Sequence, residues 1–174
     1  VFGAMTLIGA WQAWAQKDAL ASEWKSNRRW FVIVELLFLA LFVLDLSIRL
    51  GNPDLWHPYK GGERPMDFSY FNAVIKSTSF PPYDPWFAGG YITYYYYGFV
   101  LVGMPVKFLG IVPSIAYNFI LPTLFAMVGI GAFTVGSSLV AGQRSKVEDQ
   151  RLSTFDFRLL TGLAATAFTL LLGN

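Results

Sequence analysis

The chain has 174 residues, of which 55% are hydrophobic and 14% charged, with a formal net charge of +2. Soluble domains average about 45–50% apolar and about 25% charged residues, so this composition excludes a water-soluble domain, a disordered chain and, because cysteine is absent, a disulfide scaffold. No basic run indicates nucleic acid. The composition predicts an integral membrane protein in contact with membrane lipid.

Apolar runs predict an all-α, polytopic bundle of transmembrane helices. Residues 2–15 are apolar but too short to cross a bilayer alone, and a polar segment, 16–29, separates them from the clearest span, 30–48. Trp30 anchors one end of that span and Arg49 the other. The rest of the chain is divided into a loop over 51–90, spans over 91–111 and 122–141, a short helix over 113–121, a polar segment over 142–158 and a partial span over 159–172. We expect residues 1–174 to form one membrane domain that is a piece of a longer protein.

The charges do not settle the orientation. If residues 16–29 lie in the cytoplasm and every predicted span crosses, residues 142–158 lie outside, although both segments are basic. This arrangement conflicts with the usual excess of Lys and Arg on the cytoplasmic side.

The loop over 51–90 carries the most informative acid, Asp67. Pro65 suits the first turn of a helix that runs to about Ser77. At 100° per residue, Asp67 shares the apolar face of this helix with Tyr70, Phe71 and Val74. A carboxylate on a packed face is costly unless it is paired or used, so Asp67 is either a structural acid at the helix N-terminus or a functional acid.

Other charged residues of the loop extend this candidate site. Glu63 and Asp84 could join Asp67 as a general base or as oxygen ligands of a divalent cation, Mg²⁺ or Mn²⁺. Lys60 and Arg64 could bind a phosphate. A solvated loop of mixed charge is the alternative, and Asp84, which lies between two prolines, is also typical of a turn.

Two acids lie inside the first span, where an ionisable residue suggests a function. Asp45 precedes Arg49 by four residues, so we expect these two side chains to pair. Glu35 has no such partner on its own helix, and packing against a polar group of another helix is the structural alternative.

A run of four tyrosines precedes Gly98. If Tyr94, Tyr95, Tyr96 and Tyr97 are helical, they point around most of the helix and cannot all face lipid. Some hydroxyls must then face protein or a polar cavity. Because aromatic rings and hydroxyls together bind sugars well, the run predicts a sugar site.

This tyrosine run with Gly98 resembles the YYYxG signature of the YYY membrane protein family. Glu63-Arg64-Pro65-Met66-Asp67 resembles the E-K-P-M-D element of that family, with Arg64 in place of the usual Lys. The other matching stretches are Glu35-Leu36-Leu37-Phe38, Phe80 to Trp86, Gly89, Ala116-Tyr117-Asn118 and Gly173-Asn174. The resemblance covers about residues 28–174.

The resemblance implies a fold like the N-terminal part of a C-type glycosyltransferase, in a bacterial or archaeal cytoplasmic membrane. Such enzymes take a sugar from a polyprenyl-phosphate donor, and the residues implied as catalytic or metal-binding are Asp67 and Glu63, with 51–90 outside the cytoplasm. Substrate-binding residues would be Lys60, Arg64, Asp84 and Tyr94 to Tyr97. The alternative is a non-catalytic scaffold, an accessory subunit with protein partners in a membrane complex, or a lipid or polyprenol binder; a transporter fits less well.

Overall fold

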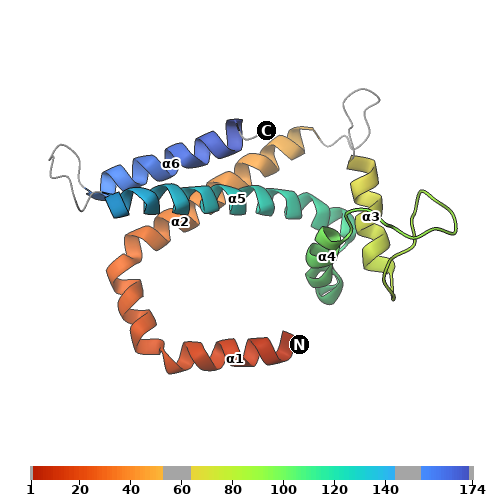
Figure 1. Ribbon diagram of the computed structural model, residues 1–174, viewed down its shortest axis with the longest axis horizontal. Coiled ribbons are helices and arrows are strands. Elements are labelled where there is room, and N and C mark those ends of the chain that lie inside the picture. Colours follow the sequence, from red (N-terminus) through yellow and green to blue (C-terminus); the bar gives the residue numbers. More distant parts are fainter. Residues whose placement is uncertain (1, 53–63, 144–153, 173–174) are drawn as a thin grey trace.

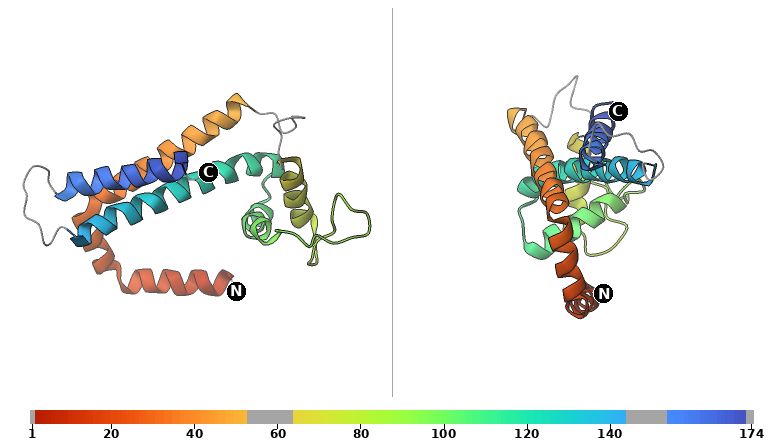
Figure 2. Two further views of the ribbon diagram at one scale, coloured as in Figure 1. Left: turned by 45° about the horizontal axis from the view of Figure 1, so that its top comes forward. Right: turned by 90° about the vertical axis from the view of Figure 1, so that its left-hand side faces the viewer.

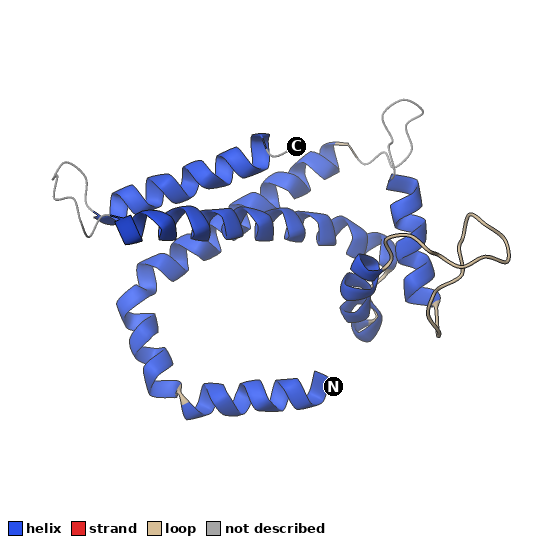
Figure 3. Ribbon diagram, in the orientation of Figure 1, coloured by secondary structure: helices blue, strands red, loops and turns tan. Residues whose placement is uncertain are grey.

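The computed structural model describes residues 2–52, 64–143 and 154–172, and this part of the chain is helical apart from one irregular segment and short connections (Figure 3). An isolated antiparallel bridge between Tyr83 and Tyr91 is the one β-type pairing in it. The prediction of an all-α chain is confirmed. The helices of the described part, in chain order (Figure 1), are α1 (Phe2–Ala15), α2 (Lys17–Gly51), α3 (Arg64–Lys76), α4 (Tyr97–Leu109), α5 (Pro113–Gln143) and α6 (Thr154–Leu172).

Three of these helices are long and apolar enough to cross a membrane: α2, α5 over Pro113–Leu139 and α6 over Phe155–Leu172. They lie side by side as a bundle, with α6 and α2 both against α5 (Figure 2). Their outward surface carries many exposed aliphatic and aromatic side chains, as expected where lipid replaces water as the solvent.

Glycines allow α5 and α6 to approach closely. A Cβ added at Gly136 would lie 2.6 Å from Cβ of Ala165, and one added at Gly162 would lie 2.7 Å from the ring of Phe133. The hydroxyl of Thr166 donates a 3.1 Å hydrogen bond to the carbonyl oxygen of Gly129. Small residues and interhelical hydrogen bonds hold helices together in lipid, so these contacts fix α6 against α5.

Helix α2 is longer than predicted at its N-terminal side. Residues 17–29, which the sequence marks only as a polar segment, are helical and continue into the span, with one break of helical geometry at Asn27 (φ −109°, ψ 16°). Thirty-five residues rise about 52 Å, well beyond the ~30 Å of hydrocarbon. The polar segment is therefore an extension of the helix beyond the span, and its charges did not prevent helix formation.

The span predicted over 91–111 is much shorter in the structure. Residues 91–96 are not helical, and α4 extends only from Tyr97 to Leu109, where Gly110 ends it in the left-handed conformation (φ 66°). Thirteen residues rise about 20 Å, which is too little to cross the hydrocarbon core. The sequence predicts a single helix here because nothing in the apolar run distinguishes residues 91–96 from the residues that follow them.

Helix α5 runs without interruption through Pro122, where the sequence predicted a short helix followed by a separate span. Pro122 is fully buried and has no N–H to donate to the carbonyl of Asn118. The next residue, Thr123, bonds from its hydroxyl to the carbonyl oxygen of Phe119 at 2.7 Å. This bond goes to the carbonyl beside the one that Pro122 leaves without a donor, so it supports the same turn of the helix; membrane helices tolerate proline where such local contacts exist.

The first half of α5 packs with α3 and α4 into a small lobe at one end of the bundle (Figure 1). Its core is formed by Phe71, Val106, Ala116 and Tyr117. Gly103 of α4 faces α3, where a Cβ would make ordinary contact with Ile75 and Val74. This lobe fixes the position of α3, which carries the candidate acid.

The irregular segment between α3 and α4 is tied back to the lobe. The N–H of Ile92 donates to the carbonyl of Pro82 at 2.9 Å, and the indole N–H of Trp86 donates to Oγ of Ser69 on α3 at 2.6 Å. Pro82 and Ile92 are buried. The segment is therefore held in one arrangement although it lacks regular secondary structure.

Candidate functional site

Asp67 lies in the first turn of α3, as the sequence predicted. The helix begins at Arg64, and the predicted inner residues Tyr70, Phe71 and Val74 are buried. Asp67 itself is half-buried. Its carboxylate is therefore on the packed face and close to the positive end of the helix dipole.

Asp67 belongs to a group of residues from three helices, which we call the junction cluster: Arg49, Asp67, Tyr117 and Asn118. The guanidinium of Arg49, from the C-terminal end of α2, donates from Nη2 to Oδ1 of Asn118 at 3.1 Å and lies 5.6 Å from the ring centroid of Tyr117. The charges of Asp67, Arg49 and Arg64 all act on the Tyr117 hydroxyl. Tyr117 is thus the residue on which the charges of α2 and α3 converge.

The predicted pair between Asp45 and Arg49 does not form in the described part of the chain, because the Arg49 side chain turns to α5 instead. Within that part, Nε of Arg49 is buried and makes no hydrogen bond. A buried guanidinium nitrogen without a partner costs free energy.

Asp84 occupies a turn. Its Oδ1 accepts a 2.8 Å hydrogen bond from the backbone N–H of Trp86, two residues on, and its own N–H donates to the carbonyl of Gly90 at 3.0 Å. Both bonds are typical of an aspartate that initiates a turn. Asp84 also acts on Tyr70, whose hydroxyl pKa is raised from 10.0 first by burial and second by this carboxylate.

The tyrosine run is not a turn of helix. Tyr96 precedes α4 as its cap and only Tyr97 is helical. The prediction that four helical tyrosines point around most of one helix is therefore wrong. The rings pair instead, Tyr94 with Tyr95 at 4.0 Å and Tyr96 with Tyr97 at 4.8 Å between centroids. The hydrogen bond to Tyr97 raises the pKa of Tyr96, with smaller contributions from burial and from the charge of Tyr97. Tyr95 and Tyr97 are 76% and 73% exposed.

The predicted site is only partly brought together. Arg64 and Asp67 share the first turn of α3, whereas Lys60 and Glu63 lie outside the described residues. A cavity of about 330 Å³ between α4 and α5 is lined almost wholly by apolar side chains, Ala116 of the lobe core among them. Asp67 and the tyrosines do not line it.

Of the acids predicted as metal ligands, the structure describes Asp67 and Asp84, and Asp84 is held in its turn, so Asp67 is the one carboxylate that remains for a metal site. In residues 2–52, 64–143 and 154–172, three or more His, Cys, Asp or Glu side chains do not gather at any point. Asp67 alone does not make a cation site of the kind that Mg²⁺ or Mn²⁺ requires. The chemistry below is therefore derived from side chains alone.

Three members of the junction cluster were not predicted as site residues: Arg49, Tyr117 and Asn118. Arg49 was interpreted as a helix-end anchor. Tyr117 and Asn118 were noted only within the matching stretch Ala116-Tyr117-Asn118. The sequence does show an arginine at the end of one span and a Tyr-Asn pair at the start of another. It does not show that they lie close together, because that depends on how the helices pack.

Long apolar helices packed through small residues, with exposed apolar surface around them, define a helical membrane protein. The whole chain, residues 1–174, matches the family described as "Uncharacterized membrane protein (DUF2298)", and it belongs to that family. No curated protein and no solved structure matches the chain significantly.

Proposed function

We propose that the protein is a membrane glycosyltransferase that takes a sugar from a polyprenyl-phosphate donor, with its reaction centre at the junction cluster. The observation that carries the proposal is the meeting of three helices at Tyr117. Asp67 lies on the packed face of α3 next to Phe68, whose ring centroid is 5.2 Å from that of Tyr117, and the guanidinium of Arg49 lies 5.6 Å from the same ring. A carboxylate can accept a proton, and a guanidinium can bind a phosphate through two parallel hydrogen bonds.

The proposed topology has three crossings, by α2, α5 and α6, with α3 and α4 on one face of the membrane. Because α4 is too short to cross, the segments 16–29 and 142–158 fall on the same side. Both are basic, so this arrangement removes the conflict with the distribution of Lys and Arg. It places the lobe, with Asp67, on the non-cytoplasmic face, in a multi-pass protein of the cell membrane.

In the proposed reaction, the carboxylate of Asp67 removes the proton of an acceptor hydroxyl. The acceptor oxygen then forms a bond to the anomeric carbon of the donor sugar, and the bond from that carbon to the phosphate oxygen breaks. The electron pair leaves with polyprenyl phosphate, whose negative charge is stabilised by the guanidinium groups of Arg49 and Arg64. Atoms and charge balance without another reactant.

The surroundings of the cluster suit the rest of such a donor. The apolar cavity between α4 and α5 offers a place for the first isoprene units, since Ala116, which lines it, is next to Tyr117 in the chain. The exposed rings of Tyr95 and Tyr97 are assigned to sugar recognition. Asp84 is assigned to its turn, and Lys60 and Glu63 stay candidates beside Arg64 and Asp67.

The experiment is a transfer assay with the full-length protein in membranes, supplied with radiolabelled polyprenyl-phosphate sugars. We expect Asp67→Asn to lower transfer by about 100-fold or more, the usual contribution of a general base. The matched control is Asp156→Asn, because Asp156 also lies in the first turn of its helix, α6. Equal transfer by Asp67→Asn and the unmodified protein would exclude Asp67 as the base.

The alternative function is a polyprenol or lipid binder, or an accessory subunit of a membrane complex, and the apolar cavity between α4 and α5 favours it. This alternative predicts retention of a polyprenyl phosphate without release of its sugar. In that case a bulky substitution in the cavity, Ala116→Phe, lowers lipid retention, and Asp67→Asn changes nothing.

A further inference from the structure

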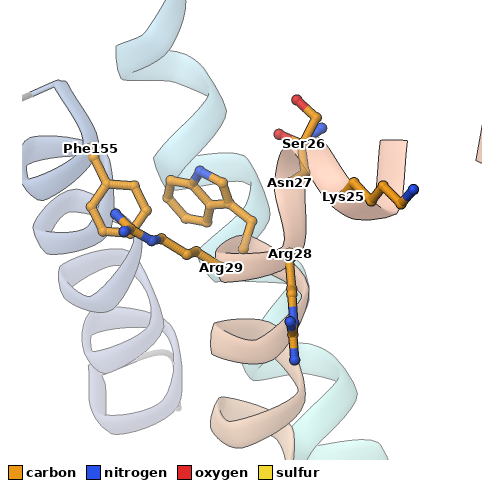
Figure 4. Close-up of a pocket in the computed structure, with 7 residues that line it drawn as sticks. Lys25, Ser26, Asn27, Arg28, Arg29 and Phe155 are labelled. Carbon is orange, nitrogen blue, oxygen red and sulfur yellow. The ribbon is translucent and has the colours of Figure 1, made fainter. Parts of the chain in front are cut away.

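A second cationic site lies at the other end of α2. Where Asn27 breaks the helical geometry, residues 25–30 and Phe155 of α6 line a cavity of about 490 Å³ (Figure 4). Trp30 and Phe155 form one side, with ring centroids 5.1 Å apart. The cavity therefore combines an aromatic wall with the basic residues Lys25, Arg28 and Arg29.

A fourth cation, Arg158 of α6, does not line this cavity but contacts Trp30, which does. Its guanidinium carbon lies 4.7 Å from the ring centroid of Trp30, and its Nε is buried without a hydrogen bond in the described part of the chain. In Figure 4 the side chain of Arg29 extends towards Phe155, whereas Lys25 and Arg28 extend in other directions. Arg29 and Arg158 are thus the two guanidinium groups placed at the aromatic wall.

Within the described residues, no carboxylate is paired with the basic side chains that line the cavity. Lys25, Arg28 and Arg29 make no ion pair with any described acid. The nearest acid along the helix, Glu23, accepts a 2.8 Å hydrogen bond from Nδ2 of Asn27. A cavity with uncompensated guanidinium groups has the charge and the donors to bind an anion.

The position of the cavity indicates what kind of anion it meets. Trp30 begins the apolar part of α2, and tryptophan prefers the level of the lipid headgroups. From Trp30 to Arg49 the helix rises about 28 Å, so the cavity is at the bilayer surface opposite the junction cluster. Basic residues at that surface face the anionic lipids of the cytoplasmic leaflet.

We propose that this cavity binds the phosphate of an anionic phospholipid headgroup, with Arg29 and Arg158 as its ligands. The planar guanidinium groups hold the phosphate oxygens, and the wall of Trp30 and Phe155 packs against the glycerol and the first methylenes of the lipid. The site does not depend on sugar transfer, because it involves none of the junction residues, but its assignment to the cytoplasmic leaflet rests on the proposed topology.

The test measures lipid bound to the purified full-length protein by native mass spectrometry, after titration with phosphatidylglycerol or phosphatidylcholine. We expect retention of phosphatidylglycerol only. Arg29→Gln and Arg158→Gln should each weaken it by about five-fold, which corresponds to the usual contribution of one Arg near an anionic surface. The control Lys17→Gln, which removes a charge from the same helix outside the cavity, should leave retention unchanged.

Three outcomes would overturn the proposal. They are equal retention of the two lipids, equal loss in Lys17→Gln and Arg29→Gln, and displacement of phosphatidylglycerol by inorganic phosphate, which would indicate a site for the free anion. Arg29→Lys keeps the charge without the planar fork, so it should retain more lipid than Arg29→Gln. A correctly folded Arg29→Gln protein is recognised by unchanged thermal unfolding, and loss of sugar transfer plays no part in this readout.

Discussion

Lys107 of α4 donates a 2.9 Å hydrogen bond from Nζ to the carbonyl oxygen of Ser77, the residue that follows the last turn of α3. Helices end with carbonyl groups that have no partner within the helix, and a lysine near them also interacts favourably with the helix dipole. This bond joins the two helices of the lobe at the end of α3 that is remote from Asp67.

We expect Lys107→Met to lower the free energy of unfolding by about 1 kcal/mol, because it removes this charged donor while keeping an apolar chain of similar length. Thermal unfolding of the full-length protein in detergent measures the change. Lys17→Met, at the start of α2, is the control and should be neutral. Equal stability of the two variants would mean that the bond contributes nothing in solution.

The role of Asp84 can be tested by comparing two substitutions. Asp84→Ala removes the acceptor of the 2.8 Å bond from the Trp86 N–H and should cost about 1 kcal/mol. Asp84→Asn keeps an oxygen at the same position and should cost less than about half of that. If both variants lose the same stability in thermal unfolding, the loss comes from the negative charge of Asp84 and not from the hydrogen bond in its turn.

The contact between α5 and α6 predicts opposite effects at two glycines of one helix. At Gly136 an added Cβ would lie 2.6 Å from Cβ of Ala165 and 2.9 Å from the carbonyl oxygen of Thr161, so Gly136→Ala should cost about 1–3 kcal/mol through overpacking. At Gly131 nothing lies within 4 Å. Gly131→Ala should therefore be neutral or stabilising, since alanine favours helix. Unfolding in detergent measures both, and a stable Gly136→Ala protein would contradict the close approach.

Tyr70 predicts a loss of stability at high pH. Burial, and then the charge of Asp84, raise its hydroxyl pKa above 10.0, so the folded protein keeps this proton at pH values where the unfolded chain releases it. The associated stability is fully present below pH 10 and declines as the pH rises from there through the folded pKa. Tyr70→Phe should make the free energy of unfolding less dependent on pH above 10, whereas Tyr95→Phe, at a ring that is 76% exposed, should not. Parallel pH profiles for Tyr70→Phe and the unmodified protein would refute this.

Local sequence patterns were sufficient to predict α3, the helix that carries Asp67. The proline at its second position and the apolar spacing of Tyr70, Phe71 and Val74 predicted α3 to within a residue at each end. The apolar run from Trp30 predicted the span in α2 for the same reason, since both signals depend only on neighbours in the chain.

Features that depend on tertiary contacts could not be predicted in this way. The apolar content of 91–111 resembles a span, but its first six residues belong to the irregular segment, in which Tyr94 and Tyr95 pair their rings instead of forming helix. The Arg49 side chain had a nearby acid on its own helix, and only the packing of α2 against α5 made Asn118 and Tyr117 its partners. The sequence thus predicted the acid of the candidate site, Asp67, but not the arginine that another helix brings to Tyr117 and Asn118.

The irregular segment between α3 and α4 carries large aromatic rings on its outer surface. Tyr83, Trp86 and Phe87 are 63%, 60% and 68% exposed, and Trp86 is at the same time fastened to α3 through Ser69. Tryptophan and tyrosine rings prefer the level of the lipid headgroups, so in the proposed topology these rings would hold α3 against the membrane surface. A substrate with a polyprenyl tail would then reach Asp67 by two-dimensional diffusion in the plane of the bilayer, and the rate of encounter would depend on its density in the leaflet instead of its concentration in water.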